Sequence, residues 1–314
     1  MHTKTAANTP LVQQKKLWKK IKRSWQVYLL VLPPLIWFLV IQYWPLSWLR
    51  MVFYDFHLYK GFEGSKFVGL QNFVKLFSKR NFLQMMWNAL ALNLWSLAFS
   101  FPALILFALL LNEMRLSKMK SLVQTISFIP HFISVVALVA IVNDVLSPSR
   151  GLIGDIFRLF GQEPINFLGE ASAFRPIMVL SANWQGMGWG AIVYLAALTS
   201  IDPTLYEAAM VDGASRWNRI INITLPGITP TIITMLILRI GSLLNTGYQK
   251  IYLLQNTMNL ETSEVLSTYL YKLGFEKMDY SMGTTVGLFN SIISIILVLL
   301  ANAISKKVSE TSLW

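Results

Sequence analysis

Six long stretches of this sequence contain no Asp, Glu, Lys or Arg, and this distribution of charge is the feature that most constrains the fold. A helix needs about 20 apolar residues to cross the hydrocarbon core of a bilayer. Lipid offers the backbone no hydrogen-bond partner, so each stretch is predicted to be a transmembrane helix. The stretches are Ser24–Leu49, Asn81–Asn112, Ser121–Asn143, Pro176–Ile201, Ile220–Leu238 and Tyr280–Ser305. The fifth is the shortest, and we expect its helix to continue past Arg239 to about Leu244.

The chain is therefore predicted to be an all-α integral membrane protein with six transmembrane helices. Its residues are 54% hydrophobic and only 13% charged, whereas a soluble domain carries about 25% charged residues. A membrane β-barrel would instead show alternating segments of about ten residues. The sequence has no cysteine and only three scattered histidines, so neither a disulfide nor a metal site is expected.

The distribution of basic residues predicts the orientation of this topology. Six helices place both termini on one side, where the predicted segments carry 14 basic and 5 acidic residues, against 12 and 10 on the other side. Basic residues favour the cytoplasmic side, so both termini are predicted to be cytoplasmic. The net charge of +12 follows from this topology and predicts no nucleic-acid partner. The chain then divides into a cytoplasmic tail (residues 1–24), a transmembrane domain (25–305) and a second cytoplasmic tail (306–314).

Two of the predicted external loops are expected to hold short helices. In the first loop, apolar residues recur at a spacing of three to four, which predicts an amphipathic helix at the outer interface. These residues are Phe67, Leu70, Phe73, Val74 and Phe77. In the second loop, SPSRGLIGDIFRLFGQEPINFLG, glycine and proline residues indicate a short helix between turns.

The stretch EAAMVDGASRWNRIINITLP lies on the predicted cytoplasmic side, between the fourth and fifth apolar runs. It is preceded by Asp202 and a proline, which together are a helix-start signal. Gly213 is expected to end this helix, as a glycine does just after a helix C-terminus. Ser215 is expected to cap a second short helix, and Leu225-Pro226 to open the fifth membrane helix. The result is a compact knob of small residues that suits insertion into a cleft on a partner protein.

This stretch resembles the signature loop of ABC importer permeases of the maltose-transporter type, whose pattern is EAAxxDGAxxxxxFxxIxLP. Ile220 stands where that family usually has Phe. Other segments, including FVGLQNFVKLF, TISFIPHFISVVALV and WGAIVYLAALTSIDPTLYEAAMVDGA, are similar to the oligosaccharide and aldouronate permease branch. The matching positions of the loop are Glu207, Ala208, Ala209, Asp212, Gly213, Ala214, Ile223, Leu225 and Pro226.

The resemblance implies a type I ABC importer permease fold, in which the loop of about residues 203–226 is a coupling helix that docks in a groove of a cytoplasmic ATPase. It implies four kinds of neighbour in a bacterial cytoplasmic membrane: lipid, a second homologous permease, two ABC ATPase subunits and an external sugar-binding protein. The chain has no GxxxxGK[ST] phosphate loop. ATP and Mg²⁺ are therefore expected at the partner ATPase, and this chain is expected to bind no cofactor and to be no enzyme.

The implied function is import of an oligosaccharide by alternating access, with a uronate-containing sugar among the candidate substrates. Two alternatives remain at this stage: a permease for a non-sugar solute, and a secondary transporter. Secondary transporters usually show an internal repeat or acidic ion-coupling residues within their helices, and neither is evident in this sequence.

A sugar pathway needs aromatic planes and hydrogen-bonding groups at membrane depth. Arg239 lies 14 residues after Leu225, which is about 21 Å along a helix and places it in the outer half of the membrane. A charge there normally faces a water-filled cavity or a partner. We expect Arg239 to contact sugar hydroxyls or a carboxylate; an ion pair with the companion permease or snorkelling to the interface are the alternatives. Further pathway candidates, each of which could instead be a helix contact or an interface anchor, are Asn183, Trp184, Gln185, Trp189, Tyr194, Asn245, Tyr248, Gln249 and Asn290.

Overall fold

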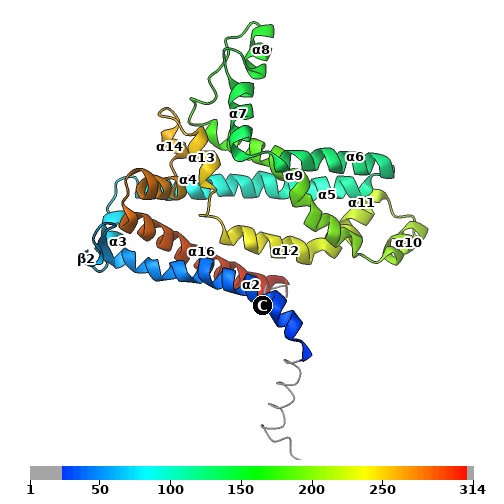
Figure 1. Cartoon of the computed structure of the whole chain (residues 1–314). Helices are drawn as coiled ribbons and strands as arrows, with labels where there is room; N and C mark the ends of the chain where they lie inside the picture. Colours follow the sequence, from blue (N-terminus) through cyan, green and yellow to red (C-terminus); the bar gives the residue numbers. More distant parts are fainter. Residues whose placement is uncertain (1–22, 310–314) are drawn as a thin grey trace, which may run out of the picture.

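The computed structural model describes residues 23–309 and is dominated by long helices, most of which run along one direction (Figure 1). The predicted N-terminal tail falls almost wholly outside the described residues, as does the end of the predicted C-terminal tail. Within the described residues, four helices are long and apolar enough to cross a membrane, or five if one bent pair counts as a span. They are Trp25–Phe53, Phe82–Glu113, Arg216–Gly241 and Tyr280–Lys307, with Ser117–Phe132 and Val135–Leu146 as the bent pair.

The long helices consist of consecutive segments with different hydrogen-bond patterns. The first is α2 (Trp25–Phe38), η1 (Leu39–Tyr43) and η2 (Trp44–Phe53), and the second is α4 (Phe82–Trp95), η3 (Ser96–Ser100) and α5 (Phe101–Glu113). Later come α6 (Ser117–Phe128), η4 (Ile129–Phe132), α7 (Val135–Leu146), α8 (Leu152–Leu159), α9 (Phe174–Thr199) and α10 (Pro203–Val211). The last long helices are α11 (Arg216–Arg219), η5 (Ile220–Thr224) and α12 (Leu225–Gly241), followed after a loop region by α16 (Tyr280–Ser309).

Three of these helices contain a π-helical turn, and each turn ends two residues before a proline. In η1, η3 and η5 the closing bond spans five residues instead of four. Proline has no amide hydrogen, and its ring clashes with the carbonyl four residues earlier. A wider turn just before the proline relieves the crowding while the helix continues. The closing bonds run from the amides of Trp44, Phe101 and Leu225 to the carbonyls of Leu39, Ser96 and Ile220.

The third apolar stretch does not form the single helix that the sequence predicts. The chain bends by 102° between α6–η4 and α7. Ile133 is extended, and the Ser134 side chain caps α7 by accepting a hydrogen bond from the Ala137 amide at 3.2 Å. A capped helix start satisfies the amides that the break exposes, so the cap stabilises the bend. Beyond it, α7 and α8 project from the bundle (Figure 1).

The fourth apolar stretch forms α9, which passes through the centre of the bundle and packs on α5, α6 and α12. Its 26 residues span about 39 Å, which is long enough to cross a bilayer. It is not among the four helices above because polar and small residues in its middle, such as Asn183 and Gln185, lower its mean hydropathy. Its core contacts with α5 and α12 include the buried residues Ala191, Tyr194 and Ile228.

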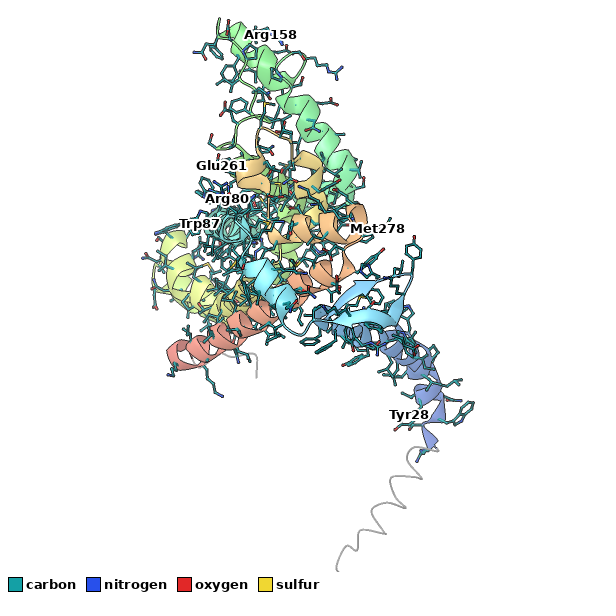
Figure 2. The ribbon with its side chains drawn as sticks, turned by 90° about the vertical axis from the view of Figure 1, so that its left-hand side faces the viewer. Tyr28, Arg80, Trp87, Arg158, Glu261 and Met278 are labelled. Carbon is teal, nitrogen blue, oxygen red and sulfur yellow. The ribbon has the colours of Figure 1, made fainter. Side chains whose placement is uncertain are left out.

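The first long helix has no buried residues in its apolar part. Figure 2 shows Tyr28, on α2, far from the bundle. Its C-terminal segment η2 packs against α16, and Val52 in η2 is fully buried. An apolar helix with no protein neighbours faces lipid or another subunit.

A hairpin and several short helices cover one end of the bundle. Strand β1 (Tyr54–His57) pairs with β2 (Gly61–Phe67) in antiparallel fashion, and α3 (Gln71–Phe77) follows. The sequence predicts the helix but not the hairpin, and the helix buries Asn72 and Leu76 while Phe77 stays exposed. The other short elements are α13 (Tyr248–Leu254), α14 (Leu260–Ser263), α15 (Leu266–Tyr271) and η6 (Lys272–Glu276).

The closest approach of α6 to α9 gives the first testable prediction. A Cβ added at Gly188 would lie 2.3 Å from the Ser127 carbonyl oxygen. Gly188→Ala must therefore separate the two helices, and we expect it to lower the free energy of unfolding by about 1–3 kcal/mol. Gly186→Ala, in the same helix, is the matched control because no heavy atom lies within 4 Å of its added Cβ.

The measurement is the melting temperature of each purified variant, followed by intrinsic fluorescence. Gly186→Ala should melt at or slightly above the wild-type temperature, because alanine favours helix over glycine by up to about 1 kcal/mol. Equal melting temperatures for Gly188→Ala and wild type would contradict the close packing of α6 on α9.

Candidate functional site

The first candidate site is α10 and the turn that follows it. The Asp202 carboxylate accepts a hydrogen bond from the Thr204 amide at 2.9 Å, and Pro203 is the first helical residue. This hydrogen bond lowers the pKa of Asp202 below its ordinary value. The helix therefore starts with the cap that the sequence predicts.

The C-terminus of α10 closes with paired hydrogen bonds around a left-handed glycine. Gly213 has φ of +72°. Its amide donates to the Met210 carbonyl at 3.2 Å, and the Ala214 amide donates to the Ala209 carbonyl at 2.9 Å. These two bonds are the Schellman arrangement, which favours glycine because other residues are strained at positive φ.

The surface of this helix and turn is open. Glu207, Ala208, Asp212 and Gly213 are exposed, while Ala209 and Ala214 are half-buried. Apolar side chains are exposed beside them, most of all Val211 at 88%. Figure 1 shows α10 at one extremity of the molecule, beyond the ends of α5 and α12. A rigid, partly apolar protrusion of this kind is suited to a protein groove.

One hydrogen bond ties this protrusion to the bundle, and the sequence analysis missed it. The Tyr206 hydroxyl lies 3.0 Å from the Thr224 hydroxyl, and Thr224 is fully buried. Thr224 ends the π turn η5, where its hydroxyl also lies 3.3 Å from the Arg219 carbonyl. The two residues are 18 positions apart, so only the folded loop reveals the contact.

The segment after the turn corrects two boundaries of the sequence analysis. Ser215 caps α11 as predicted, accepting from the Asn218 amide at 3.2 Å. However, Leu225 and Pro226 do not open a separate helix, because α11, η5 and α12 form one continuous helix. That helix ends at Gly241, not near Leu244 as predicted.

The second candidate site is a cavity of about 190 Å³ among α4, α9, α12 and the loop after α12. It contains Arg239 and Asn245, which the sequence analysis proposed for a pathway. The Arg239 guanidinium donates to the Ser96 hydroxyl of η3 at 2.9 Å. The other lining residues are Leu92, Asn93, Ser96, Met178, Val179, Ala182, Thr246, Gly247 and Ile251.

The remaining pathway candidates on α9 do not line this cavity. Trp184 borders a separate apolar pocket of about 350 Å³ against α7. Gln185 donates to the Ile133 carbonyl at 2.9 Å, at the bend after α6. Trp189 stacks on His131 with ring centres 4.6 Å apart, and Tyr194 is only 2% exposed in the core. Asn183 is half-buried in the same helix.

Three candidates lie on or after the other helices. Tyr248 begins α13 and stacks on Tyr271 with ring centres 4.8 Å apart, and Gln249 beside it is exposed. Asn290 in α16 has a buried side-chain oxygen with no hydrogen-bond partner among the described residues. Of the ten pathway candidates, the structure thus brings only Arg239 and Asn245 to one cavity.

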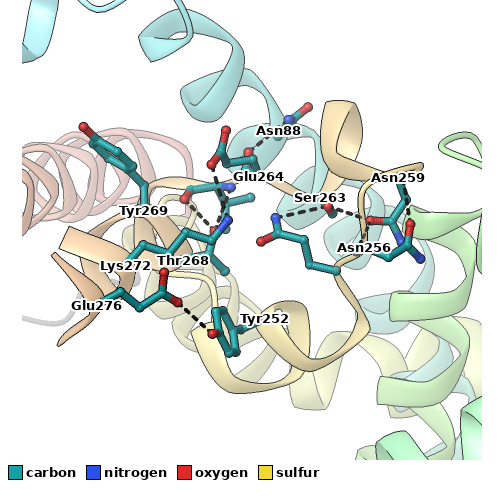
Figure 3. A network of polar contacts seen from close by, with 12 residues as sticks. Asn88, Tyr252, Asn256, Asn259, Ser263, Glu264, Thr268, Tyr269, Lys272 and Glu276 are labelled. Atoms are coloured by element: carbon teal, nitrogen blue, oxygen red, sulfur yellow. Dashed lines mark hydrogen bonds and ion pairs between the residues drawn. The ribbon is translucent and has the colours of Figure 1, made fainter. Parts of the chain in front are cut away.

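A polar network ties the short helices to α4 (Figure 3). The Asn88 amide nitrogen donates to the backbone carbonyls of Glu261 and Glu264 at 2.7 and 3.0 Å. The Glu264 carboxylate pairs with Lys272 at 3.5 Å, and Tyr252 donates to Glu276 at 2.7 Å. The Asn88 bonds hold the segment after α12 against α4, and the other two bonds stabilise that segment internally.

Comparison with known proteins agrees with this arrangement. Residues 105–310 match the family described as "Binding-protein-dependent transport system inner membrane component". The polygalacturonan/rhamnogalacturonan transport system permease protein YteP of Bacillus subtilis (strain 168) is 41% identical over 302 residues, which are 96% of this chain and 94% of that protein.

Two solved structures are similar over almost the whole chain. A crystal structure of a bacterial ABC transporter involved in import of the acidic polysaccharide alginate contains a chain with TM-score 0.86 and 41% identity, covering 94% of this chain and 99% of that one. A second, of the bacterial alginate ABC transporter in complex with alginate pentasaccharide-bound periplasmic protein, gives TM-score 0.85 and 41% identity, covering 95% and 100%.

These matches define the class as membrane-embedded permeases of ABC importers with the type I fold. The chain belongs to the family of binding-protein-dependent transport system inner membrane components.

Lys250, next to the cavity, gives a prediction about stability and pH. Its ammonium lies 3.4 Å from the Met178 carbonyl, and burial lowers the pKa of Lys250 to about 8. An unfolded lysine has a pKa of about 10.4, so between these two values the unfolded state binds more protons and stability rises with pH. Below pH 8 the full cost of the buried charge remains.

Lys250→Met removes this cost, and at pH 7 it should stabilise the protein by about 1–3 kcal/mol. The difference in melting temperature from wild type should shrink as the pH is raised from 8 to 10. Lys277→Met, at an exposed lysine, should show no such trend. A Lys250→Met protein that is less stable than wild type at pH 7 would refute the prediction.

Proposed function

We propose that this chain is a transmembrane subunit of an ATP-driven importer for acidic oligosaccharides, and that α10 is its coupling helix. The carrying observation is that one continuous helix, α11–α12, begins beside the α10 protrusion and ends at a polar cavity containing Arg239. The proteins similar to this chain include transporters for polygalacturonan or rhamnogalacturonan and for alginate, which are acidic polysaccharides.

The proposed topology has six membrane-spanning segments. Four are the long apolar helices, the fifth is the bent unit of α6 and α7, and the sixth is α9. Both termini and residues 203–226 would then be cytoplasmic, with residues 25–305 as the transmembrane domain. The excess of basic residues on this side supports the orientation.

The proposed coupling partner is a separate ATPase that holds ATP and Mg²⁺. Glu207 would pair with a cationic group in its groove, and the exposed Ala208 and Gly213 allow close approach. When ATP closes two such ATPases, α10 moves with them and biases the bundle between inward and outward openings. This chain itself carries out no hydrolysis and binds no cofactor in the proposed mechanism.

A second, homologous permease is the proposed neighbour of the first helix. The apolar part of Trp25–Phe53 has no buried residues in this structure, and Trp25, Leu30 and Trp37 are all more than half exposed. A companion subunit would cover this surface, and an external sugar-binding protein would deliver substrate to the pair. The cavity of Arg239 and Asn245 is the proposed part of the pathway on this subunit.

The docking of α10 is tested by purifying the tagged chain from membranes and measuring the ATPase that co-purifies. Gly213→Trp places a bulky side chain on the protrusion, where no heavy atom of the chain lies within 4 Å of the added Cβ. We expect the bound ATPase to fall at least tenfold, because the side chain would occupy the partner's groove.

Gly161→Trp is the matched control, since Gly161 also has a left-handed φ (+69°) and open space around its added Cβ. It follows α8, which lies at a different extremity from α10 (Figure 1). The control should retain the bound ATPase, and its ATPase activity should still respond to the binding protein loaded with an acidic sugar. A chain that purifies alone, or equal losses for both variants, would argue against the coupling function.

Transmission from α10 to the bundle gives a separate prediction. Tyr206→Phe removes the hydroxyl that bonds to Thr224 and leaves the exposed face of α10 unchanged. The ATPase should remain bound, but sugar uptake per ATP hydrolysed should fall severalfold, because motion of α10 is passed less directly to α12. Tyr280→Phe serves as the control. An unchanged ratio of uptake to hydrolysis would show that the Tyr206 bond does not transmit the motion.

A further inference from the structure

Two more cations lie along the same seam between α4 and α9 as Arg239. The Arg239 side chain bonds to Ser96, at one end of the seam. Lys250 reaches the Met178 carbonyl of α9, in the middle. At the other end, the Arg175 guanidinium of α9 donates to the Asn88 side-chain oxygen of α4 at 3.2 Å.

The spacing of their partners shows that the three cations form a row. Asn88, Leu92 and Ser96 follow one another at intervals of four residues, which places them on one face of the second long helix. Eight residues of helix span about 12 Å. Arg175, Met178 and Ala182 follow the facing side of α9, and Leu92, Met178 and Ala182 line the cavity.

No carboxylate of the described residues pairs with this row of cations. Among residues 23–309, ion pairs within 4.0 Å form only between Arg158 and Asp155 and between Lys272 and Glu264. The Nε atom of Arg175 is buried and has no hydrogen-bond partner among the described residues. Lys250 is partly buried, and its ammonium bonds to a backbone carbonyl as its one partner within residues 23–309, which is a weak partner for an ammonium.

Arg175 and Lys250 are partly buried, whereas Arg239 is exposed. Partly buried cations without acidic partners are costly unless they serve an anion. A carboxylate suits both residue types, because guanidinium groups bind it through paired N–H bonds and ammonium groups bind it as a point charge. Of the three cations, Arg239 alone lines the cavity, whose walls combine apolar side chains from Leu92, Met178 and Ile251 with polar ones such as Asn93 and Thr246. A mixed wall of this kind beside cations fits sugar rings, each with an apolar C–H face, hydroxyl groups and a carboxylate.

We propose that Arg175, Lys250 and Arg239 form a track that binds successive carboxylates of a uronate oligosaccharide as it passes along α9. This inference rests on the proposed function and adds Arg175 and Lys250 as residues that select acidic over neutral sugars. The outer end of the track lies at Asn88 and Arg175, next to the short helices that follow α12.

The test compares uptake of trigalacturonate with that of its carboxyl-reduced, neutral analogue. The complete transporter, with its ATPases and binding protein, is reconstituted in liposomes, and each sugar is supplied at a concentration that saturates the binding protein. Lys250→Met and Arg175→Met should each lower the ratio of acidic to neutral uptake by roughly tenfold or more, since each removes a charge-assisted contact. Lys277→Met, at an exposed lysine, is the matched control and should leave the ratio unchanged.

Charge-conserving variants separate selection from structure. Lys250→Arg and Arg175→Lys should restore most of the ratio, because they keep a cation in the track. If the methionine variants reduce uptake of both sugars equally, or reduce assembly with the companion permease, the cations are structural partners and the inference is wrong. Failure of the proposed function would look different, because the wild-type complex would then hydrolyse ATP without response to either sugar.

Discussion

A helix in lipid must satisfy its own backbone hydrogen bonds, and the rest of this structure depends on how the chain meets that requirement around proline. Pro45, Pro102 and Pro226 each follow a π turn closed by a bond across five residues. The turns keep three long helices continuous where a proline would otherwise break or kink them. A different solution operates after η4, where a side-chain cap at Ser134 allows a bend of 102°.

The same π turns hold the residues that connect the two candidate sites. Ser96, the partner of Arg239, is the first residue of η3, and Thr224, the partner of Tyr206, is the last residue of η5. A π turn shifts the following residues around the helix axis, so it changes which side chains face a neighbouring helix. In η5 this shift sets how the side chains of α12, Arg239 among them, are oriented relative to α11.

The long stretches without charged residues were sufficient to predict where the long helices lie, because the cost of burying a charge in lipid acts on each segment separately. The cap at Asp202 and the turn at Gly213 were predictable for a similar reason, since both use only residues near in sequence. The bend after η4 was not predictable, because a straight helix and a broken helix can have the same apolar composition.

Contacts between distant segments could not be predicted from the sequence either. The charge of Lys250 assigns it to an external loop, but only the fold brings α13 back against α9 and removes that ammonium from water. Arg175 ends an apolar run in the sequence, and its contact with Asn88 spans 87 positions. Pairing of this kind depends on how helices are arranged in space, which periodicity along one helix does not encode.

The geometry of α11–α12 explains how events at the two candidate sites can be linked without a change inside the helix. Thr224 and Arg239 are 15 residues apart, or about 22 Å along a helix. A tilt at the Thr224 end, driven through Tyr206, would move the Arg239 end as well, because α11, η5 and α12 form one continuous helix, although Pro230 within α12 donates no backbone hydrogen bond. Arg239 would then leave or approach Ser96, which belongs to a different helix. The walls of the cavity come from α4, α9 and α12. The Tyr206–Thr224 bond joins the α10 protrusion to η5, which continues into α12, so movement of the protrusion would change the shape of the cavity.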